Sequence, residues 1–536
     1  MPDTVRPVAL GVLIAALLVP WSAFGQADTT QAGAKEAAVR RLSVDDAVRL
    51  ALEQNLSLQV QRLDPQLQDL ATAQVRTAWT PTISSTLSNQ SSTNPVSSFL
   101  AGASSQLVNK NFGLSVQANQ QLEWGGGNYN VTWSNSRAES NSVFSSPNPA
   151  LASSLSATFT QPLLRNFRID GNRQQLLISK KNREMSDVQL RQTVLQTIRS
   201  VKSAYWDLAY AVDNLKVQQQ SLDIARESLR DNKARVAVGT MAPIDIIEAE
   251  AEVARNEESV IVAQAEITRA EDALRQLVFD PKSPGFWSMT FDLTDTPVFR
   301  AQDVDVDGAV RTALDRRTDI VNMRKSLEAD DINIRYYKNQ TLPDLNVQAG
   351  YGMTGQGGTS YTFNDSFPPV VTSVQEKSYR SVLSQMFGND FHNWSVAVTV
   401  GYPLGRSAGE AALARAKVAY SQSELQLRSL ELSVATQVRE AARTLNTNRK
   451  RVDATRVSRE LAERKLVAEQ KKFEAGMSTN FLVIQAQRDL ATARNAELQA
   501  VLDYNRSLVD FETVQEAPIS GGGVTLATSS GPSSGQ

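Results

Sequence analysis

Few side chains in this sequence can carry acid–base or metal chemistry. The 536 residues include one histidine, His392, and no cysteine. Thiol catalysis, disulfides, cysteine-based zinc sites and cysteine-linked lipid anchors are therefore excluded. His392 has no candidate nucleophile near it in the sequence, and a site with several histidines would need several chains around one axis. We therefore expect neither an enzyme nor a bound cofactor or metal.

Three glycines, Gly350, Gly352 and Gly355, match the spacing of the dinucleotide-binding fingerprint. That motif needs a helix directly after it, whose N-terminus meets the pyrophosphate. The sequence that follows, GGTSYTFND, has no helical pattern. We interpret the glycines as the end of a strand and the start of a long polar surface loop over residues 354–393, with His392 near the end of the loop.

The charges of the chain are balanced, with a formal net charge of -2 and 21% charged residues. The charge-rich stretch 439–472 alternates in sign, which is typical of a solvated helix face. Nothing in this distribution predicts a nucleic-acid partner, because nucleic-acid binding requires concentrated positive charge.

The N-terminus has the pattern of a secretory signal. One basic residue, Arg6, precedes an apolar core over residues 8–19, and small residues offer cleavage sites near residues 23–27. The core is too short for a membrane-spanning helix, and no later stretch approaches 18 uncharged apolar residues. We expect a signal peptide over 1–27 and a linker over 28–41; a buried N-terminal helix is the alternative.

The chain contains two copies of one sequence unit. LSVDDAVRLALEQN, from residue 42, resembles VDVDGAVRTALDRR, from residue 304, and Pro81 and Pro343 keep the same offset of 262 residues. Gly239 and Gly476 are only 237 residues apart, so the first copy has 25 extra residues after its proline. We expect repeat 1 over 42–278, a connecting segment over 279–303, repeat 2 over 304–516 and a disordered Gly/Ser-rich tail over 517–536.

Each repeat has the same order of helical patterns, rich in helix-favouring residues. We predict helices over 43–78, 171–238 and 243–278 in repeat 1 and over 304–340, 408–475 and 480–515 in repeat 2. Pro65 is expected to kink the first helix. The second and third helix of each repeat form a hairpin, over 171–278 and 408–515, whose long arm would measure roughly 100 Å.

Between the first and second helix of each repeat, the pattern changes to the alternation of β-strands. In residues 394–402, the side chains of Trp394, Val396, Val398 and Val400 share one face. Such alternation with aromatic ends is typical of transmembrane strands, although a half-buried strand of a soluble sandwich gives the same pattern. We predict barrel strands within about 81–162 and 343–403, including 112–124, 128–133, 154–161, 345–351 and 394–402.

Two spanning strands per repeat would give four per chain. Four strands cannot close a barrel without edges exposed to lipid. Several chains would therefore share one barrel, and their helix hairpins would continue it as a bundled cylinder. The 25 extra residues of repeat 1 leave room for an additional hairpin, with a glycine-rich turn at 124–127.

The order of these motifs resembles that of the TolC-like outer-membrane efflux proteins over about 42–516. The resemblance rests on LSVDDAVRLALEQN, on TAWTPTIS, on the strand-to-helix exits FTQPLLRN and GYPLGRS, and on the two glycine turns. It implies a mixed α+β membrane protein: a homotrimer with a 12-stranded outer-membrane β-barrel, continued by a long periplasmic α-helical barrel. It also implies docking onto a periplasmic adaptor (membrane fusion protein) and an inner-membrane transporter, in the outer membrane of a Gram-negative-type bacterium.

The resemblance implies that the two glycine turns form the periplasmic tips. Glycine permits the positive φ of such a turn, and Pro243 suits the start of the next helix. We expect the exposed turn residues to meet the adaptor: Val238, Gly239, Thr240, Ala475, Gly476 and Met477.

The resemblance also implies a constriction at the tips, but this chain departs from the family pattern. Where the type member has two acidic residues in the second tip, this chain has Leu482 and Gln485. The tyrosine of the closing latch falls on Phe473, and its arginine on Ser478.

Our hypothesis is an apolar constriction at Leu482, since a narrow dry ring can stop ions by dewetting. The acidic pair of this chain lies in the first tip, at Asp245 and Glu248, and Asp245 would serve as a latch or adaptor contact. Packing of Leu482 between helices, with both carboxylates solvated, is the alternative.

The sequence therefore predicts a passive export duct for small molecules or polypeptides. No chemistry is required of the duct, because the inner-membrane partner supplies the energy. The alternative from another class is a secreted periplasmic coiled-coil structural or adaptor protein without a pore.

Overall fold

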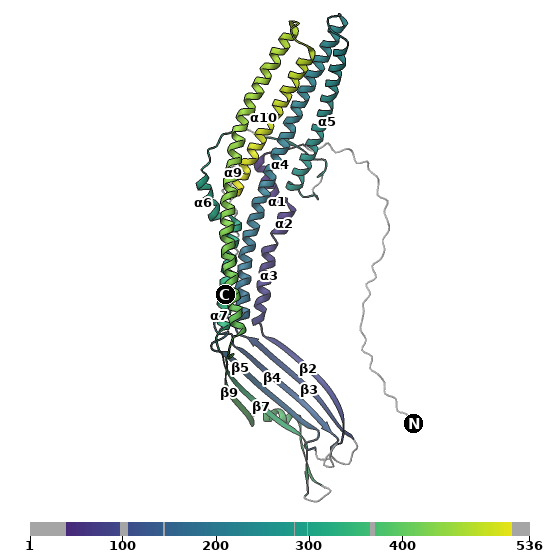
Figure 1. The fold of residues 1–536 in the computed structure, drawn as a ribbon. Helices are drawn as coiled ribbons and strands as arrows, with labels where there is room; N and C mark the ends of the chain where they lie inside the picture. The colour runs from purple at the N-terminus through teal and green to yellow at the C-terminus, as the bar shows by residue number, and fades with distance from the viewer. Residues whose placement is uncertain are drawn as a thin grey trace, which may run out of the picture.

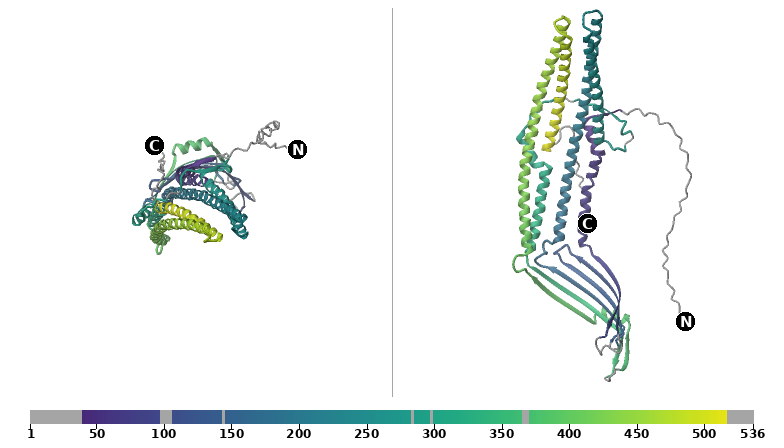
Figure 2. Two further views of the ribbon diagram at one scale, coloured as in Figure 1. Left: turned by 90° about the horizontal axis from the view of Figure 1, so that it is seen from above. Right: turned by 45° about the vertical axis from the view of Figure 1, so that its right-hand side comes forward.

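The protein is elongated, with a β-sheet at one end and paired helices running away from it (Figure 1). The computed structural model describes residues 39–96, 106–142, 145–282, 285–296, 299–364 and 370–516. The predicted signal peptide, most of the linker after it and the predicted tail lie outside the described residues. Seen end-on, the helices lie along an arc (Figure 2). Within the described ranges, no helix is both long and apolar enough to cross a membrane.

Two helix hairpins form the long part of the molecule. Their helices are α4 (Gly171–Ala237, 67 residues), α5 (Ile244–Val278, 35 residues), α9 (Ala408–Glu474, 67 residues) and α10 (Asn480–Gln515, 36 residues). Side chains cap both long helices: Asp170 accepts a hydrogen bond from the N–H of Arg173, and Ser407 and Glu410 form a capping box. These four helices agree with the predicted ones to within one residue at every end.

The helix predicted over 43–78 is divided. It consists of α1 (Val44–Gln54), α2 (Leu56–Gln61), α3 (Asp64–Arg76) and the 3-10 turn η1 (Thr77–Trp79). Asn55 causes the first break, because its backbone is extended and its side chain accepts a hydrogen bond from the N–H of Leu58. Pro65 does not kink a continuous helix; it lies in the first turn of α3, where a missing N–H has no intrahelical partner to lose.

The helix predicted over 304–340 is also divided, into α6 (Val306–Arg316) and α7 (Thr318–Gln340). Arg317 between them has an extended backbone. The carboxylate of Glu516 accepts hydrogen bonds from the backbone N–H and the hydroxyl of Thr318, at 2.9 and 2.7 Å. A residue just beyond α10 therefore caps α7, and this long-range contact holds the break.

The alternating segments all belong to one antiparallel sheet. Its order is β2-β3-β4-β5-β7-β8, and β9 pairs with the first part of β7. The strands are β2 (Thr82–Pro95), β3 (Gln106–Gln121), β4 (Asn128–Ser140), β5 (Ala150–Pro162), β7 (Asp344–Phe363), β8 (Val371–Lys377) and β9 (Phe391–Gly401). Chain direction therefore alternates across the whole sheet.

The predicted count of four strands per chain is wrong. Residues 82–162 supply four strands, because the extra residues of the first half form a second hairpin. The turn between β3 and β4 contains Gly125 and Gly126, both with positive φ, as the glycine-rich sequence predicted. Twelve strands from three chains would require four strands per chain, whereas this sheet has seven.

The long loop predicted over 354–393 is largely regular structure. Strand β7 continues to Phe363, and β8 and α8 (Tyr379–Phe387) follow before β9 begins. Gly350, Gly352 and Gly355 all lie within β7. This agrees with a strand interpretation of the three glycines and leaves no helix directly after them.

A small parallel pair lies beside the helices, formed by β1 (Val39–Leu42) and β6 (Thr290–Leu293). Tyr205 of α4 joins it to the first hairpin: its buried hydroxyl donates to the carbonyl of Leu42 at 3.0 Å and accepts from the N–H of Asp295 at 3.2 Å. Burial raises the pKa of Tyr205 to about 12. We call this region the waist.

The other half has its own core against the second hairpin. Tyr504 of α10 is buried, and its hydroxyl donates to the carbonyl of Arg300 at 2.6 Å. The side chains around it come from α6, α7, α9 and α10: Ala313, Ile320, Val434, Val438, Leu445 and Phe511. In both halves a buried tyrosine therefore binds the backbone of the connecting segment.

Replacing Tyr205 by phenylalanine tests the waist. Tyr205→Phe leaves the Leu42 carbonyl and the Asp295 N–H without their buried partner, which we expect to destabilise the fold by about 1–2 kcal/mol. The measurement is the melting temperature in detergent, followed by helical circular dichroism. Tyr420→Phe, on a partly buried face of α9, is the control; equal melting temperatures for the two variants would contradict the role of Tyr205.

Candidate functional site

One face of the sheet carries small uncharged polar side chains. Cross-strand partners point to the same side of a sheet, and successive residues alternate between sides. The pairing therefore places one continuous row together: Ser84, Gln117, Thr132, Ser156, Gly352 and Asn393. Among the paired residues of β2, β3, β4, β5, β7 and β9, Asp344 is the one charge on this side. We call it the polar face.

The opposite face carries an apolar band across all six of these strands. Its members include Leu87, Leu114, Val116, Val131, Trp133, Leu155, Ala157, Tyr351, Met353, Trp394 and Val396. On β7 the band runs from Leu345 to Met353, about 26 Å along the strand. Beyond it, the same side turns polar at Lys110, Asn135 and Ser153. We call this side the apolar face.

Helix α8 lies on the apolar face, just beyond the band. A Cβ at Gly355 would be 2.1 Å from the carbonyl oxygen of Val382, so only glycine lets the helix approach β7 this closely. Tyr379 donates a hydrogen bond to Asn135 at 2.5 Å, and Met386 is fully buried against the sheet. Seen end-on, this green helix lies on the convex side of the arc of helices (Figure 2).

The two hairpin tips have the same backbone geometry. Gly239 and Gly476 both have φ of +74° in open space. The N–H of Thr240 donates to the carbonyl of Arg235 at 2.9 Å, and the N–H of Met477 donates to that of Lys472 at 2.8 Å. These are Schellman motifs, in which a glycine ends the helix. Both glycine turns therefore lie where the sequence predicted them.

Both tips expose apolar side chains. Val238 and Met477 are each 74% exposed. Behind them, the first turns of α5 and α10 expose Ile244, Ile247, Phe481 and Leu482. An exposed apolar cluster rimmed by polar residues is typical of a surface that binds another protein.

The predicted gate residues do not form one cluster. Asp245 and Glu248 are partly exposed on the first turns of α5. Among the contacts that the structure describes, neither carboxylate forms a hydrogen bond or ion pair with the other hairpin. Leu482 is 45% exposed, and Gln485 donates a hydrogen bond to Asp489 of its own helix. Phe473 contacts Arg235 of the first hairpin.

Behind the tips, two contacts join α4 to the second hairpin. The guanidinium of Arg235 lies 4.7 Å from the ring centre of Phe473, a cation–π contact. One turn away, Asn232 donates a hydrogen bond to Asn480 at 2.9 Å, and both side chains are buried. Separating a buried amide pair leaves both amides without hydrogen-bond partners, which costs free energy. The pair therefore fixes the two hairpins relative to each other.

A third contact joins α5 to α10. Glu252 is buried and accepts hydrogen bonds from Arg488 at 2.6 Å and from Arg255 of its own helix at 2.6 Å. Burial by itself raises the pKa of Glu252, but the two arginines outweigh it and hold that pKa below its usual value. We call these three contacts the cross-hairpin links. The sequence analysis missed them, because their members lie more than 230 residues apart.

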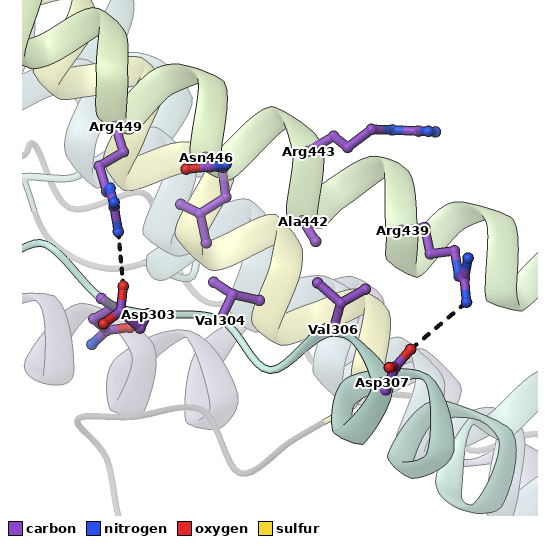
Figure 3. A pocket seen from close by; sticks show the side chains of 11 residues that line it. Asp303, Val304, Val306, Asp307, Arg439, Ala442, Arg443, Asn446 and Arg449 are labelled. Atoms are coloured by element: carbon purple, nitrogen blue, oxygen red, sulfur yellow. Dashed lines mark hydrogen bonds and ion pairs between the residues drawn. The ribbon is translucent and has the colours of Figure 1, made fainter.

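An open groove lies between the connecting segment and α9 (Figure 3). It encloses about 740 Å³. Arg449 pairs with Asp303 at 3.0 Å, and Arg439 lies 3.7 Å from Asp307. Both carboxylates are largely exposed, so these are solvated surface pairs that contribute little to stability.

His392 is exposed on β9, and its ring stacks on that of Tyr351. Its Nδ1 lies 3.3 Å from the carbonyl oxygen of Asn389. Within the described part of the chain, no group of three or more metal-binding side chains is present. The candidate site is therefore the combination of a two-faced sheet and linked helix tips.

Comparisons with known proteins agree with this arrangement. The model of the family described as outer membrane efflux protein matches residues 126–278 and 309–514. The outer membrane protein TolC of Vibrio cholerae is 22% identical over 336 residues, which cover 62% of this chain and 70% of TolC.

Solved outer-membrane channels have the same fold. The Campylobacter jejuni CmeC channel has a TM-score of 0.61 at 14% identity, covering 88% of this chain and 85% of CmeC. The open state of the Neisseria gonorrhoeae MtrE channel has a TM-score of 0.59 at 16% identity, covering 89% of each chain. With the family model matching well over half of its length, this chain belongs to the outer membrane efflux protein family, whose members are TolC-like channels.

Proposed function

We propose that this chain is the outer-membrane channel of a tripartite efflux or type I secretion system. Three copies would form a passive duct across the outer membrane and the periplasm for small molecules or polypeptides. A periplasmic adaptor and an inner-membrane transporter would complete the system. The observation that carries the proposal is one sheet with an apolar and a polar face that leads directly into helices roughly 100 Å long.

The two faces support a membrane location for the sheet. An apolar band about 25 Å tall with aromatic residues at its borders is the outer surface of known outer-membrane barrels. The band here extends about 26 Å along β7, which a strand tilt of about 40° reduces to a height of about 20 Å, and Trp133, Tyr351 and Trp394 lie near its border away from the helices. The polar face would line the water-filled interior.

The tips support a partner at the far end. Two identical turns with exposed Val238 and Met477 offer apolar contacts to the adaptor. The cross-hairpin links lie directly behind these turns, so separation of the two hairpins requires breaking them. We propose that these links, with Leu482 as an apolar constriction, control opening of the duct.

A pair of neighbouring substitutions on β4 tests the membrane assignment. Val131→Arg puts a charge on the apolar face at an expected cost of about 2–4 kcal/mol in the bilayer, whereas Thr132→Arg points to the proposed water-filled side. We expect wild type and Thr132→Arg to give heat-modifiable oligomers in the outer membrane and conductance in planar bilayers, and Val131→Arg to lose both. Equal insertion of the two variants would contradict the assignment. A soluble wild-type protein without conductance would instead favour a coiled-coil structural or adaptor protein.

Two substitutions at the second tip separate gating from docking. Leu482→Ala should raise single-channel conductance or leak, because it shortens the side chain proposed to narrow the duct. Met477→Asp should leave conductance unchanged and reduce export in cells, because it places a charge on the proposed adaptor contact. Conductance that is unchanged in Leu482→Ala would remove Leu482 from the gate.

The ion-paired link predicts a pH effect with a defined sign. Because the pKa of Glu252 is lowered in the linked state, the link is complete above the usual glutamate pKa of about 4.3 and is lost as the pH falls through the lowered value. Arg488→Ala should weaken the link by about 1–2 kcal/mol and raise conductance already at neutral pH.

The control for Arg488→Ala breaks an ion pair that also involves α10 but lies entirely within the second hairpin. Lys465 pairs with Asp489 at 2.7 Å between α9 and α10, and Lys465→Ala should leave conductance unchanged. Glu252→Gln should abolish the acid response. An acid-induced rise in conductance that survives in Glu252→Gln would assign it to another group.

A further inference from the structure

The sheet ends in two unpaired edges. Among the strands that the structure describes, β2 pairs with β3 alone and β9 pairs with β7 alone. Each edge therefore presents a row of backbone N–H and C=O groups without a partner. In hydrocarbon every such group must be hydrogen-bonded, so both edges need a strand beside them.

The two edges complement each other in direction. Strand β2 starts at the helical end and β9 finishes there, and the directions alternate at every step between them. The six long strands are an even number, so β2 of one copy and β9 of another meet antiparallel. Bacterial outer-membrane barrels have even numbers of antiparallel strands for this reason.

The two edges also agree in which side is apolar. Ile83 and Leu87 of β2 lie on the apolar face, as do Val396 and Val398 of β9. Ser84 and Thr399 lie on the polar face. Ser85 and Asn89 also lie on the apolar side of β2, so Ile83 and Leu87 alone extend the apolar band to this edge. Pairing β2 with β9 therefore keeps the apolar and the polar side of the sheet on matching sides.

We propose that three copies close the sheet by pairing β2 of each copy with β9 of the next, which gives an eighteen-stranded barrel. The partner of each edge is a second copy of this chain. The inference rests on the proposed function, because it takes the sheet to span the membrane as part of a trimer. Three chains with six long strands each supply the eighteen strands.

A twelve-stranded alternative would use only β4, β5, β7 and β9. It requires β3 to leave β4, although the two are paired along their length from Asn109 to Gln121. It also removes Leu114 and Val116 from the apolar band. The alternative therefore loses both backbone hydrogen bonds and apolar surface that the sheet already has.

The extra strands widen the interior. Barrels of 16–18 strands leave an aqueous channel, whereas eight strands leave room only for side chains. Among the paired residues that the structure describes on the six long strands, the hydroxyl and amide lining has one charge, Asp344, at the helical end. Along these six strands the barrel therefore admits bulky cargo without selecting it by charge, and the narrowest point of the duct lies elsewhere.

Paired cysteines test the closure directly, because the chain has no cysteine of its own. Ser84→Cys on β2 is combined in turn with a cysteine at each of four polar-face positions of β9: Asn393→Cys, Ser395→Cys, Ala397→Cys and Thr399→Cys. The matched series replaces Ser84→Cys by Thr132→Cys on β4. Outer membranes that contain the variants are treated with a mild oxidant to form disulfides. Covalent oligomers are then detected on denaturing gels without reductant.

We expect at least one combination with Ser84→Cys to convert most of the protein into covalent trimers, and the Thr132→Cys series and all single variants to remain monomeric on the gel. Cross-linking in the Thr132→Cys series, or none in either series, overturns the eighteen-stranded closure when the parent protein conducts. A parent that forms neither an outer-membrane oligomer nor a conducting channel overturns the proposed function itself.

Discussion

The structure depends on the separation of apolar and polar side chains to opposite faces of one sheet. A strand places successive side chains on opposite sides, so a one-residue slip at any pairing would move Trp133 or Val398 among the hydroxyl and amide groups. Every register in the sheet must therefore be correct at once. The same constraint explains Gly355, because α8 can lie on the apolar face beyond the band only where β7 has no side chain.

Four short connections join this sheet to the helices, and the waist lies farther along the helices. Helices α3 and α7 lead into β2 and β7, and β5 and β9 lead into α4 and α9. Tyr205 and Tyr504 each bind backbone outside the hairpins with a buried hydroxyl, so the segments before and between the two halves are held against the helices. An unpaired buried hydrogen-bonding group costs about 1–3 kcal/mol. These contacts therefore oppose sliding of the long helices along the segments that the two tyrosines bind.

Local sequence was sufficient where one physical signal dominated. The hairpin helices and the two glycine turns follow from composition, and β9 follows from the alternation of Trp394 to Val400. The sequence did not predict strand β2. Its segment TISSTLSNQSSTNP places Ser and Thr on both faces, and only Ile83 and Leu87 mark the apolar side. The break at Arg317 depends on Glu516, and the cross-hairpin links on residues such as Glu252 and Arg488, which meet only after both hairpins have folded. Contacts of this kind have no periodic signature.

The position of the second core gives α10 the mechanics of a lever. Tyr504 and Phe511 hold its C-terminal part, while near the tip it is restrained by side chains such as Asn480 and Arg488. From Tyr504 to Asn480 the rod measures about 36 Å, so a tilt of about 10° around the core displaces the tip by about 6 Å. A small tilt at the core would therefore move the tip by several ångströms while α10 stays helical along its length.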